Sequence, residues 1–80
     1  MTPAACRERL FLLALRADRE CQWLAAASHV AVSWRRQEDG SMVARGPTSA
    51  EIDAIERHAG DVDRAVVVAA LALLRSVATG

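Results

Sequence analysis

No lysine, tyrosine or asparagine occurs in this chain of 80 residues, which also has only two cysteines, two prolines and three aromatic side chains. Neither sign of charge is in excess, because ten arginines balance ten acidic residues. A net charge of zero provides no overall attraction to nucleic acid or to an anionic membrane. The longest apolar run, Ala65 to Leu74, has ten residues, whereas a membrane-spanning helix needs about 17 to 25. We therefore expect neither nucleic acid nor a membrane as a partner.

The scarcity of cysteine and histidine argues against disulfide, metal and catalytic chemistry. Cys6 and Cys21 both fall within one segment of helical periodicity. They are fifteen positions apart in the sequence, which would separate them by roughly 22 Å along a helix, too far for a disulfide. His29 and His58 lie near predicted helix ends, and neither has a histidine or cysteine three or four residues away. No serine lies in a nucleophile elbow, and no glycine-rich loop follows a strand. We expect no catalytic residue, metal site or cofactor, and therefore no enzyme.

The most informative segment is residues 30–60, where the hydrophobic period changes from two to about three-and-a-half. The period of two over residues 30–46 predicts a β-hairpin. A two-residue Asp39-Gly40 loop would mix the faces by placing Arg45 beside Trp34. A three-residue loop with Gly40 in the left-handed region instead pairs residue 34 with 44 and residue 36 with 42. This register predicts a buried face of Val30, Val32, Trp34, Met42 and Ala44, and an outer face of Ala31, Ser33, Arg35, Val43 and Arg45. We expect Trp34 to lie beneath the last helix.

The rest of the chain predicts helices, so the expected fold is mainly helical α+β with the order αββαα in one domain. Thr48 and Glu51 form a capping box at the start of one helix. Gly60 ends that helix, and Asp61 caps the next one. The predicted elements are a long helix over residues 3–28, the hairpin over 30–46, and helices over 49–59 and 62–78.

The run from Ala65 to Leu74 makes the last helix apolar on every side. Such a helix must be surrounded, and an 80-residue chain has few elements with which to cover it. It is either a central core helix or a helix shared across a homodimer. We expect the homodimer, in which Val67, Leu71 and Leu74 face the partner. In that arrangement the side chains that face the chain's own core are Val66, Ala70, Leu73 and Val77.

Basic side chains and an unpaired strand edge coincide on the hairpin. Arg35, Val43 and Arg45 share its outer face, and Arg36 lies near the turn. A strand edge can pair with an extended peptide through main-chain hydrogen bonds, and arginines pair with carboxylates. We expect these four residues to bind a protein or an acidic peptide segment of a larger complex. A solvated basic face and a nucleic-acid surface with Trp34 as stacking residue are the alternatives.

Residues 30–70 have a characteristic order of segments. A strand, Val30–Trp34, is followed by the Asp39-Gly40 turn and a basic strand, Ser41–Arg45. Gly46-Pro47-Thr48 then lead into a helix that contains Ile52 and Ile55. Over residues 30–70 the chain resembles the TubC-type N-terminal docking domains of nonribosomal peptide and polyketide synthases. The resemblance implies an αββαα homodimer. It also implies that the exposed hairpin binds a short, often acidic, C-terminal peptide of the preceding synthase subunit.

A second function of a different class also fits the sequence. A small stand-alone phage or mobile-element protein could inhibit a host defence or enzyme complex by covering its surface, which needs no catalytic residue. We expect a cytoplasmic location for either function. The apolar run from Leu10 to Leu15 has only six residues before Arg16, which is too short for a secretory signal.

Overall fold

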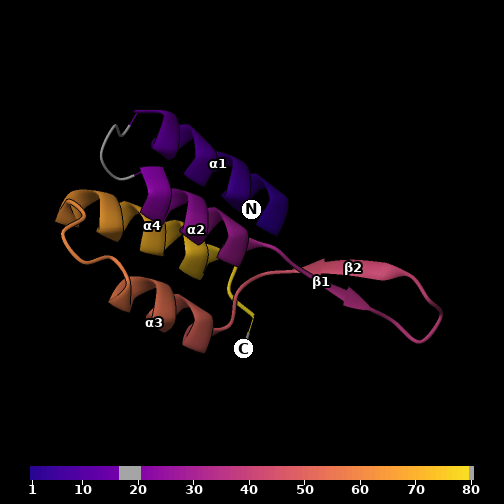
Figure 1. Ribbon diagram of the computed structural model, residues 1–80. Helices are drawn as coiled ribbons and strands as arrows, with labels where there is room; N and C mark the ends of the chain where they lie inside the picture. The colour runs from indigo at the N-terminus through magenta and orange to yellow at the C-terminus, as the bar shows by residue number, and fades with distance from the viewer. Residues whose placement is uncertain (17–20, 80) are drawn as a thin grey trace.

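The computed structural model describes residues 1–16 and 21–79, with helices packed around one core and a hairpin that projects from one end (Figure 1). The elements in chain order are α1 (Pro3–Arg16), α2 (Cys21–Ala31), β1 (Ser33–Arg36), β2 (Met42–Arg45), α3 (Ser49–Arg57) and α4 (Arg64–Ser76). The prediction of a mainly helical α+β fold, with a hairpin between helices, is confirmed.

The single long helix predicted over residues 3–28 is wrong. α1 ends at Arg16, and α2 begins at Cys21 and runs antiparallel beside α1 (Figure 1). Residues 17–20, which the prediction placed inside that helix, lie outside the described residues. Folding back lets the two helices cover each other's apolar side chains. The buried side chains of the two helices include Cys6 and Leu10 of α1 and Leu24 and Ala27 of α2.

The separation expected between Cys6 and Cys21 assumed a single helix and no longer applies. Cys6 is buried, and its thiol donates a hydrogen bond to the carbonyl of Leu73 at 3.3 Å. Burial raises the pKa of this thiol, so it stays neutral and packs as a small apolar side chain. The side chain of Cys21 lies outside the described residues.

The helix predicted to be shared with a partner is α4, and the chain itself covers one side of it. The assignment of Val67, Leu71 and Leu74 to a partner-facing surface is wrong, because they are only 2%, 3% and 0% exposed. α2, folded back from α1, supplies the extra neighbour that the sequence did not reveal. Of the side chains expected to face the chain's own core, Ala70 and Val77 are buried. The other two, Val66 and Leu73, are half-buried. Among the described helices, none is long and apolar enough to cross a membrane.

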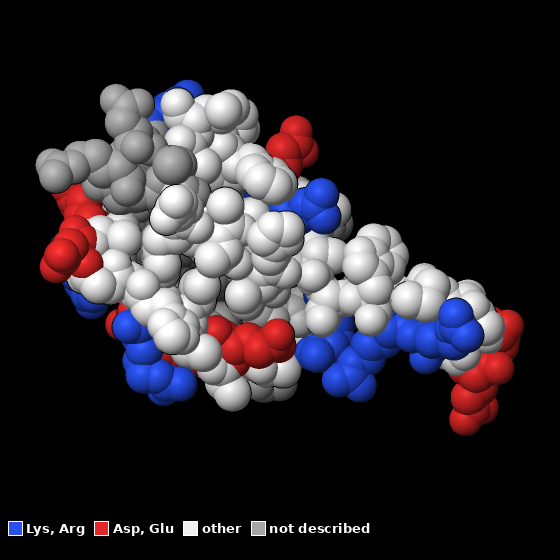
Figure 2. All heavy atoms as spheres, in the orientation of Figure 1, with Lys and Arg blue, Asp and Glu red and all other residues white. Residues whose placement is uncertain are grey.

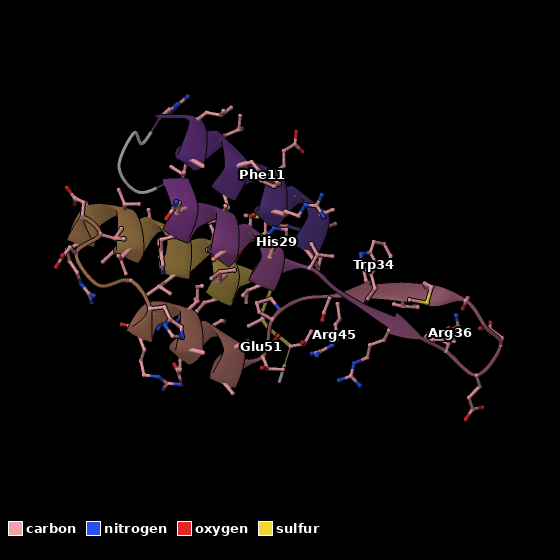
Figure 3. The ribbon with its side chains drawn as sticks, in the orientation of Figure 1. Phe11, His29, Trp34, Arg36, Arg45 and Glu51 are labelled. Carbon is pink, nitrogen blue, oxygen red and sulfur yellow. The ribbon has the colours of Figure 1, made fainter. Side chains whose placement is uncertain are left out.

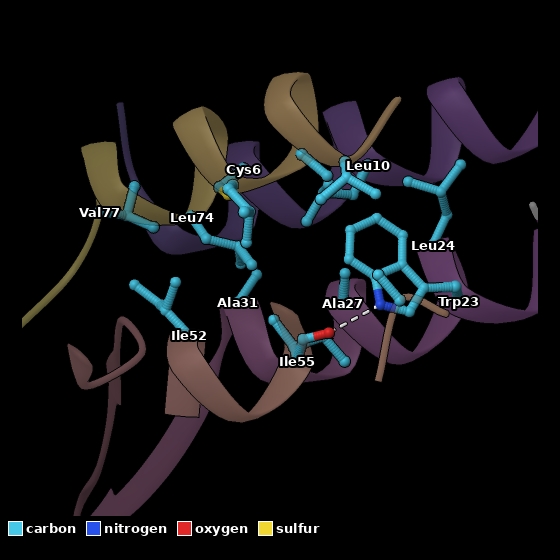
Figure 4. Close-up of a cluster of buried hydrophobic side chains, with 14 residues drawn as sticks. Cys6, Leu10, Trp23, Leu24, Ala27, Ala31, Ile52, Ile55, Leu74 and Val77 are labelled. Atoms are coloured by element: carbon cyan, nitrogen blue, oxygen red, sulfur yellow. Dashed lines mark hydrogen bonds between the residues drawn. The ribbon is translucent and has the colours of Figure 1, made fainter. Parts of the chain in front are cut away.

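Trp23, to which the sequence assigned no role, is the aromatic side chain of the core. It is 7% exposed, and its indole nitrogen donates to the carbonyl of Ile55 at 2.8 Å (Figure 4). The amide of Ala59, which would pair with this carbonyl in a longer α-helix, donates to Glu56 instead at 3.1 Å. Trp23 therefore caps the end of α3 and joins it to α2.

The register predicted for the hairpin is confirmed. Trp34 pairs with Ala44, and Arg36 pairs with Met42. Gly40 has φ +86°, and its amide donates to the carbonyl of Gln37 at 3.0 Å, as the three-residue loop requires. The strands are shorter than predicted, because residues 30 and 31 belong to the end of α2.

The capping box predicted at the start of α3 is confirmed, whereas the end of α3 and the start of α4 differ from the prediction. α3 ends at Arg57 with His58 as its C-cap, and not at Gly60. The Thr48 hydroxyl accepts from the Glu51 amide at 3.2 Å, and the Glu51 carboxylate accepts from the Thr48 amide at 3.0 Å. Gly60 has φ +54° in the turn that follows α3. α4 is capped by Asp63, whose carboxylate accepts from the Ala65 amide at 2.8 Å, and not by Asp61.

The last described residues of the chain hold the base of the hairpin. The amide of Thr79 donates to the carbonyl of Pro47 at 2.8 Å, and its hydroxyl donates to the carbonyl of Gly46 at 3.0 Å. A Cβ atom at Gly46 would lie 1.7 Å from the carbonyl oxygen of Val77, so only glycine allows this approach. The passage from β2 into α3 is therefore fixed against the end of α4.

Candidate partner-binding surface on the hairpin

The hairpin extends away from the helices (Figures 1 and 2), and most residues of its two strands are exposed. Trp34 is 62% exposed and Met42 is 51% exposed, so the prediction that they lie in the core is wrong. Alternation of apolar residues shows that two faces differ, but it does not show whether another element covers either face. β1 begins only at Ser33 and leaves the helical body at once, and Trp23 already fills the core.

Three of the four residues predicted to bind a partner share one face. The register places Arg35 opposite Val43 and Arg45 opposite Ser33, and these are the residues of that face. Arg36 lies on the other face, because it follows Arg35 in the strand and pairs with Met42. Figure 2 shows basic atoms along the lower side of the hairpin, where the sequence predicted them. We refer to Ser33, Arg35, Val43 and Arg45 as the basic face.

Glu51 of α3 lies at the base of the basic face, a position that sequence reasoning missed because it explained this residue by capping alone. One oxygen of its carboxylate lies 3.9 Å from the guanidinium of Arg45 (Figure 3). The hydrogen bond from the Thr48 amide lowers the pKa of Glu51, and the charges of Arg45 and Arg35 lower it further. The Nε atom of Arg45 is buried and has no hydrogen-bond partner among the described residues. Arg45 is thus partly neutralised, whereas Arg35 is exposed.

The opposite face of the hairpin is apolar and continues onto α1. By the register it carries Trp34, Met42 and Ala44, with Arg36 toward the turn. Trp34 and Phe11 of α1 line a groove of about 380 Å³ together with Ala4, Arg7, Glu8, Val32 and Ala44. The Arg7 guanidinium lies 5.7 Å from the centre of the Phe11 ring, within the range of a cation–π contact. We refer to Trp34, Met42 and Ala44 with Phe11 as the apolar face.

The tip of the hairpin is acidic. Asp39 accepts hydrogen bonds from the amide of Ser41 at 2.9 Å and from its hydroxyl at 2.6 Å. These bonds lower the pKa of Asp39, which therefore keeps its negative charge. Glu38 lies beside it and is exposed. An acidic ligand is repelled from the tip and attracted toward the base.

The histidines lie where the sequence placed them, at helix ends. His29 is in the last turn of α2, and His58 follows the last residue of α3. Both are exposed. Within the described part of the chain, no three histidine, cysteine or acidic side chains come together in a group that could hold a metal ion.

Comparison of this chain with protein-family models, with curated proteins and with solved structures found no match. Its function is therefore argued from the chemistry of its surface.

Proposed function

We propose that this chain is a non-catalytic docking module that binds an acidic peptide segment of a partner protein along its hairpin. The observation that supports this most is a two-stranded sheet that projects into solvent beside a basic face. None of the described residues pairs with the outer edge of either strand. Unprotected edges of this kind are used for strand addition by extended peptides. The module would work in the cytoplasm without a cofactor.

The backbone pattern identifies which groups are available to a peptide. The amide of Gln37 donates to the carbonyl of Ser41 at 2.8 Å, and the pairs of an antiparallel ladder alternate between bonded and non-bonded. Arg35 and Val43 therefore exchange hydrogen bonds within the hairpin. The backbone groups of Trp34 and Arg36 on β1, and of Met42 and Ala44 on β2, point outward. Either edge can accept a third strand.

The basic face selects the charge of that strand. Arg35 and Arg45 would pair with carboxylates of the peptide, while Val43 contributes apolar contact. Exposed ion pairs contribute only about 0.2–1 kcal/mol each and weaken in salt. They would select the partner, while main-chain hydrogen bonds hold it. The resemblance of residues 30–70 to TubC-type docking domains implies the same use of the hairpin, and this supports the proposal.

Self-association remains part of the proposal, but on a different surface from the predicted one. Between α1 and α4 lies an apolar groove of about 470 Å³, lined by Leu12, Leu13, Ala69, Ala72 and Leu73 among others. Its neighbours Leu15 and Val68 are exposed. The chain exposes 5303 Å², whereas a compact monomer of this mass exposes about 4,700 Å². A second copy that covers the groove would bury these exposed apolar side chains.

The docking proposal is tested by selecting a phage-displayed library of random eight-residue peptides on the protein. Peptides rich in Asp and Glu should be enriched, and they should bind more weakly as salt is raised. The matched pair Arg35→Glu and Arg36→Glu makes the same change of charge on neighbouring residues and opposite faces. We expect Arg35→Glu to weaken a selected peptide about tenfold and Arg36→Glu less than about threefold.

Arg45 requires a milder substitution, since Arg45→Glu would place a carboxylate beside Glu51. Arg45→Gln removes the charge without adding this repulsion, and it should weaken the selected peptide by about two- to fivefold. Far-ultraviolet circular dichroism should show unchanged helix content in all three variants. If acidic peptides are not enriched, or if the two charge reversals weaken binding equally, the basic face is not the docking site.

A further inference from the structure

The two faces of the hairpin differ in chemistry, and a strand added at either edge would meet both. The basic face carries Arg35 and Arg45, whereas the apolar face carries Trp34 and Met42, both more than half exposed. In Figure 3 the side chain of Trp34 rises on one side of the hairpin, while Arg45 lies on the other, toward Glu51. A docked peptide therefore needs two kinds of side chain.

The apolar face also ends in a place of defined shape. Phe11 comes from α1 and Trp34 from β1, and the groove that they line has a volume of about 380 Å³. Pockets that bind small ligands span about 300–1,000 Å³, so a space of this size suits one large side chain. Aromatic side chains that are exposed in the free protein and buried on binding often supply much of the binding energy.

Successive side chains of a β-strand point to opposite faces of the sheet. A third strand on the hairpin would therefore direct residues i, i+2 and i+4 toward one face and the intervening residues toward the other. We propose that the partner segment is an extended strand in which acidic residues alternate with large apolar ones. Its acidic residues face Arg35 and Arg45, and one of its apolar residues enters the groove between Phe11 and Trp34. This inference rests on the docking function proposed above.

Charge complementarity favours such a partner over a second copy of this hairpin. β1 has the sequence Ser-Trp-Arg-Arg and β2 has Met-Val-Ala-Arg, so neither strand contains a carboxylate. Edge-to-edge pairing of two copies would bring arginines together without an acidic residue between them. The only acidic residues of the hairpin, Glu38 and Asp39, lie at its tip. They also direct the acidic residues of a partner toward the base.

The test uses the same peptide library but reads the positions of the enriched residues. Selection on the wild-type protein should enrich peptides in which Asp or Glu alternates with Leu, Ile, Val, Phe or Trp. On binding, a selected peptide should protect Trp34 from iodide quenching, while Trp23 is already buried. Trp34→Ala and Phe11→Ala should each weaken that peptide about tenfold. The control Val68→Ala, an exposed apolar residue on α4, should leave its affinity unchanged.

The outcomes separate this inference from the docking function. The inference is supported if selection on the wild-type protein enriches alternating peptides, while selection on Trp34→Ala still enriches acidic residues but no longer enriches large apolar ones. Acidic peptides without alternation, or with affinity unchanged by Trp34→Ala, overturn it while the docking function stands. If selection yields no acidic peptides that depend on Arg35, both proposals are overturned. Trp34 is too exposed for its loss to unfold the protein, and thermal unfolding followed by circular dichroism checks this.

Discussion

The same substitution should destabilise the protein at one of its two tryptophans and have little effect at the other. Trp23 is 7% exposed and its indole nitrogen satisfies the Ile55 carbonyl, whereas Trp34 is 62% exposed and has no hydrogen bond among the described residues. Trp23→Phe keeps an aromatic ring but leaves the Ile55 carbonyl without its donor. An unpaired buried polar group costs about 1–3 kcal/mol, and the smaller ring adds a packing loss of about 1 kcal/mol. We expect Trp23→Phe to lower the free energy of unfolding by about 2–4 kcal/mol.

Trp34→Phe is the matched control, and it should change the free energy of unfolding by less than about 0.5 kcal/mol. Urea unfolding followed by far-ultraviolet circular dichroism measures both variants without relying on tryptophan emission. For a domain of this size the difference corresponds to a fall in Tm of at least about 8 °C. A Trp34→Phe variant as unstable as Trp23→Phe would refute the exposed position of Trp34, and a Trp23→Phe variant as stable as the wild-type protein would refute the assignment of Trp23 to the core.

Iodide quenching provides an independent reading of the same two variants. Trp34→Phe leaves only Trp23, whose emission should lie at short wavelength and resist quenching by iodide. Trp23→Phe leaves only Trp34, which should emit at long wavelength and be quenched readily. If Trp23 is quenched as readily as Trp34, the packing of α2 against α3 is not as described.

Two further predictions concern Glu51 and self-association. Glu51→Gln preserves a capping-box side chain but removes the carboxylate that lies 3.9 Å from Arg45. Selected acidic peptides should therefore bind about two- to fivefold more tightly to this variant. Unchanged or weaker binding would show that Arg45 does not face the peptide. The folded state lowers the pKa of Glu51 below its ordinary value of 4.5, so its stabilising effect is present above that pH and lost as the pH falls through the folded-state pKa. Between pH 6 and pH 3, the free energy of unfolding should therefore decrease less steeply for Glu51→Gln than for the wild-type protein. Sedimentation should detect a dimer at micromolar concentration that Leu12→Glu disrupts, and a wild-type monomer under these conditions would refute the proposed contact.

Local signals predicted the parts of the fold that short segments determine. The positive φ of Gly40 and the alternation before it were enough for the hairpin register, because a one-residue slip would exchange the two faces. The reciprocal bonds of Thr48 and Glu51 are likewise properties of four consecutive residues. The basic face followed from the register, and Arg35, Val43 and Arg45 lie on it as predicted.

Long-range packing was beyond such signals. Neither glycine nor proline occurs between Arg16 and Cys21, so helical periodicity continued across the point where the chain folds back. That reversal supplies the neighbour which buries Leu71 and the rest of the predicted partner face. It also brings Trp23 into the core and leaves Trp34 in solvent. Periodicity identifies the apolar side of an element, but only the tertiary arrangement determines what lies against it.

The attachment of Thr79 to Gly46 and Pro47 has a consequence for the way a bound partner would be oriented. Only Val32 separates α2 from β1, and residues 46–48 connect β2 to α3. With the second connection held by the chain's own end, the hairpin has little freedom to pivot on the helical body. A peptide bound to the hairpin edge would therefore be held at a defined angle to the helices. Because the hairpin is already fixed in the free protein, it would lose little rotational freedom when the peptide binds.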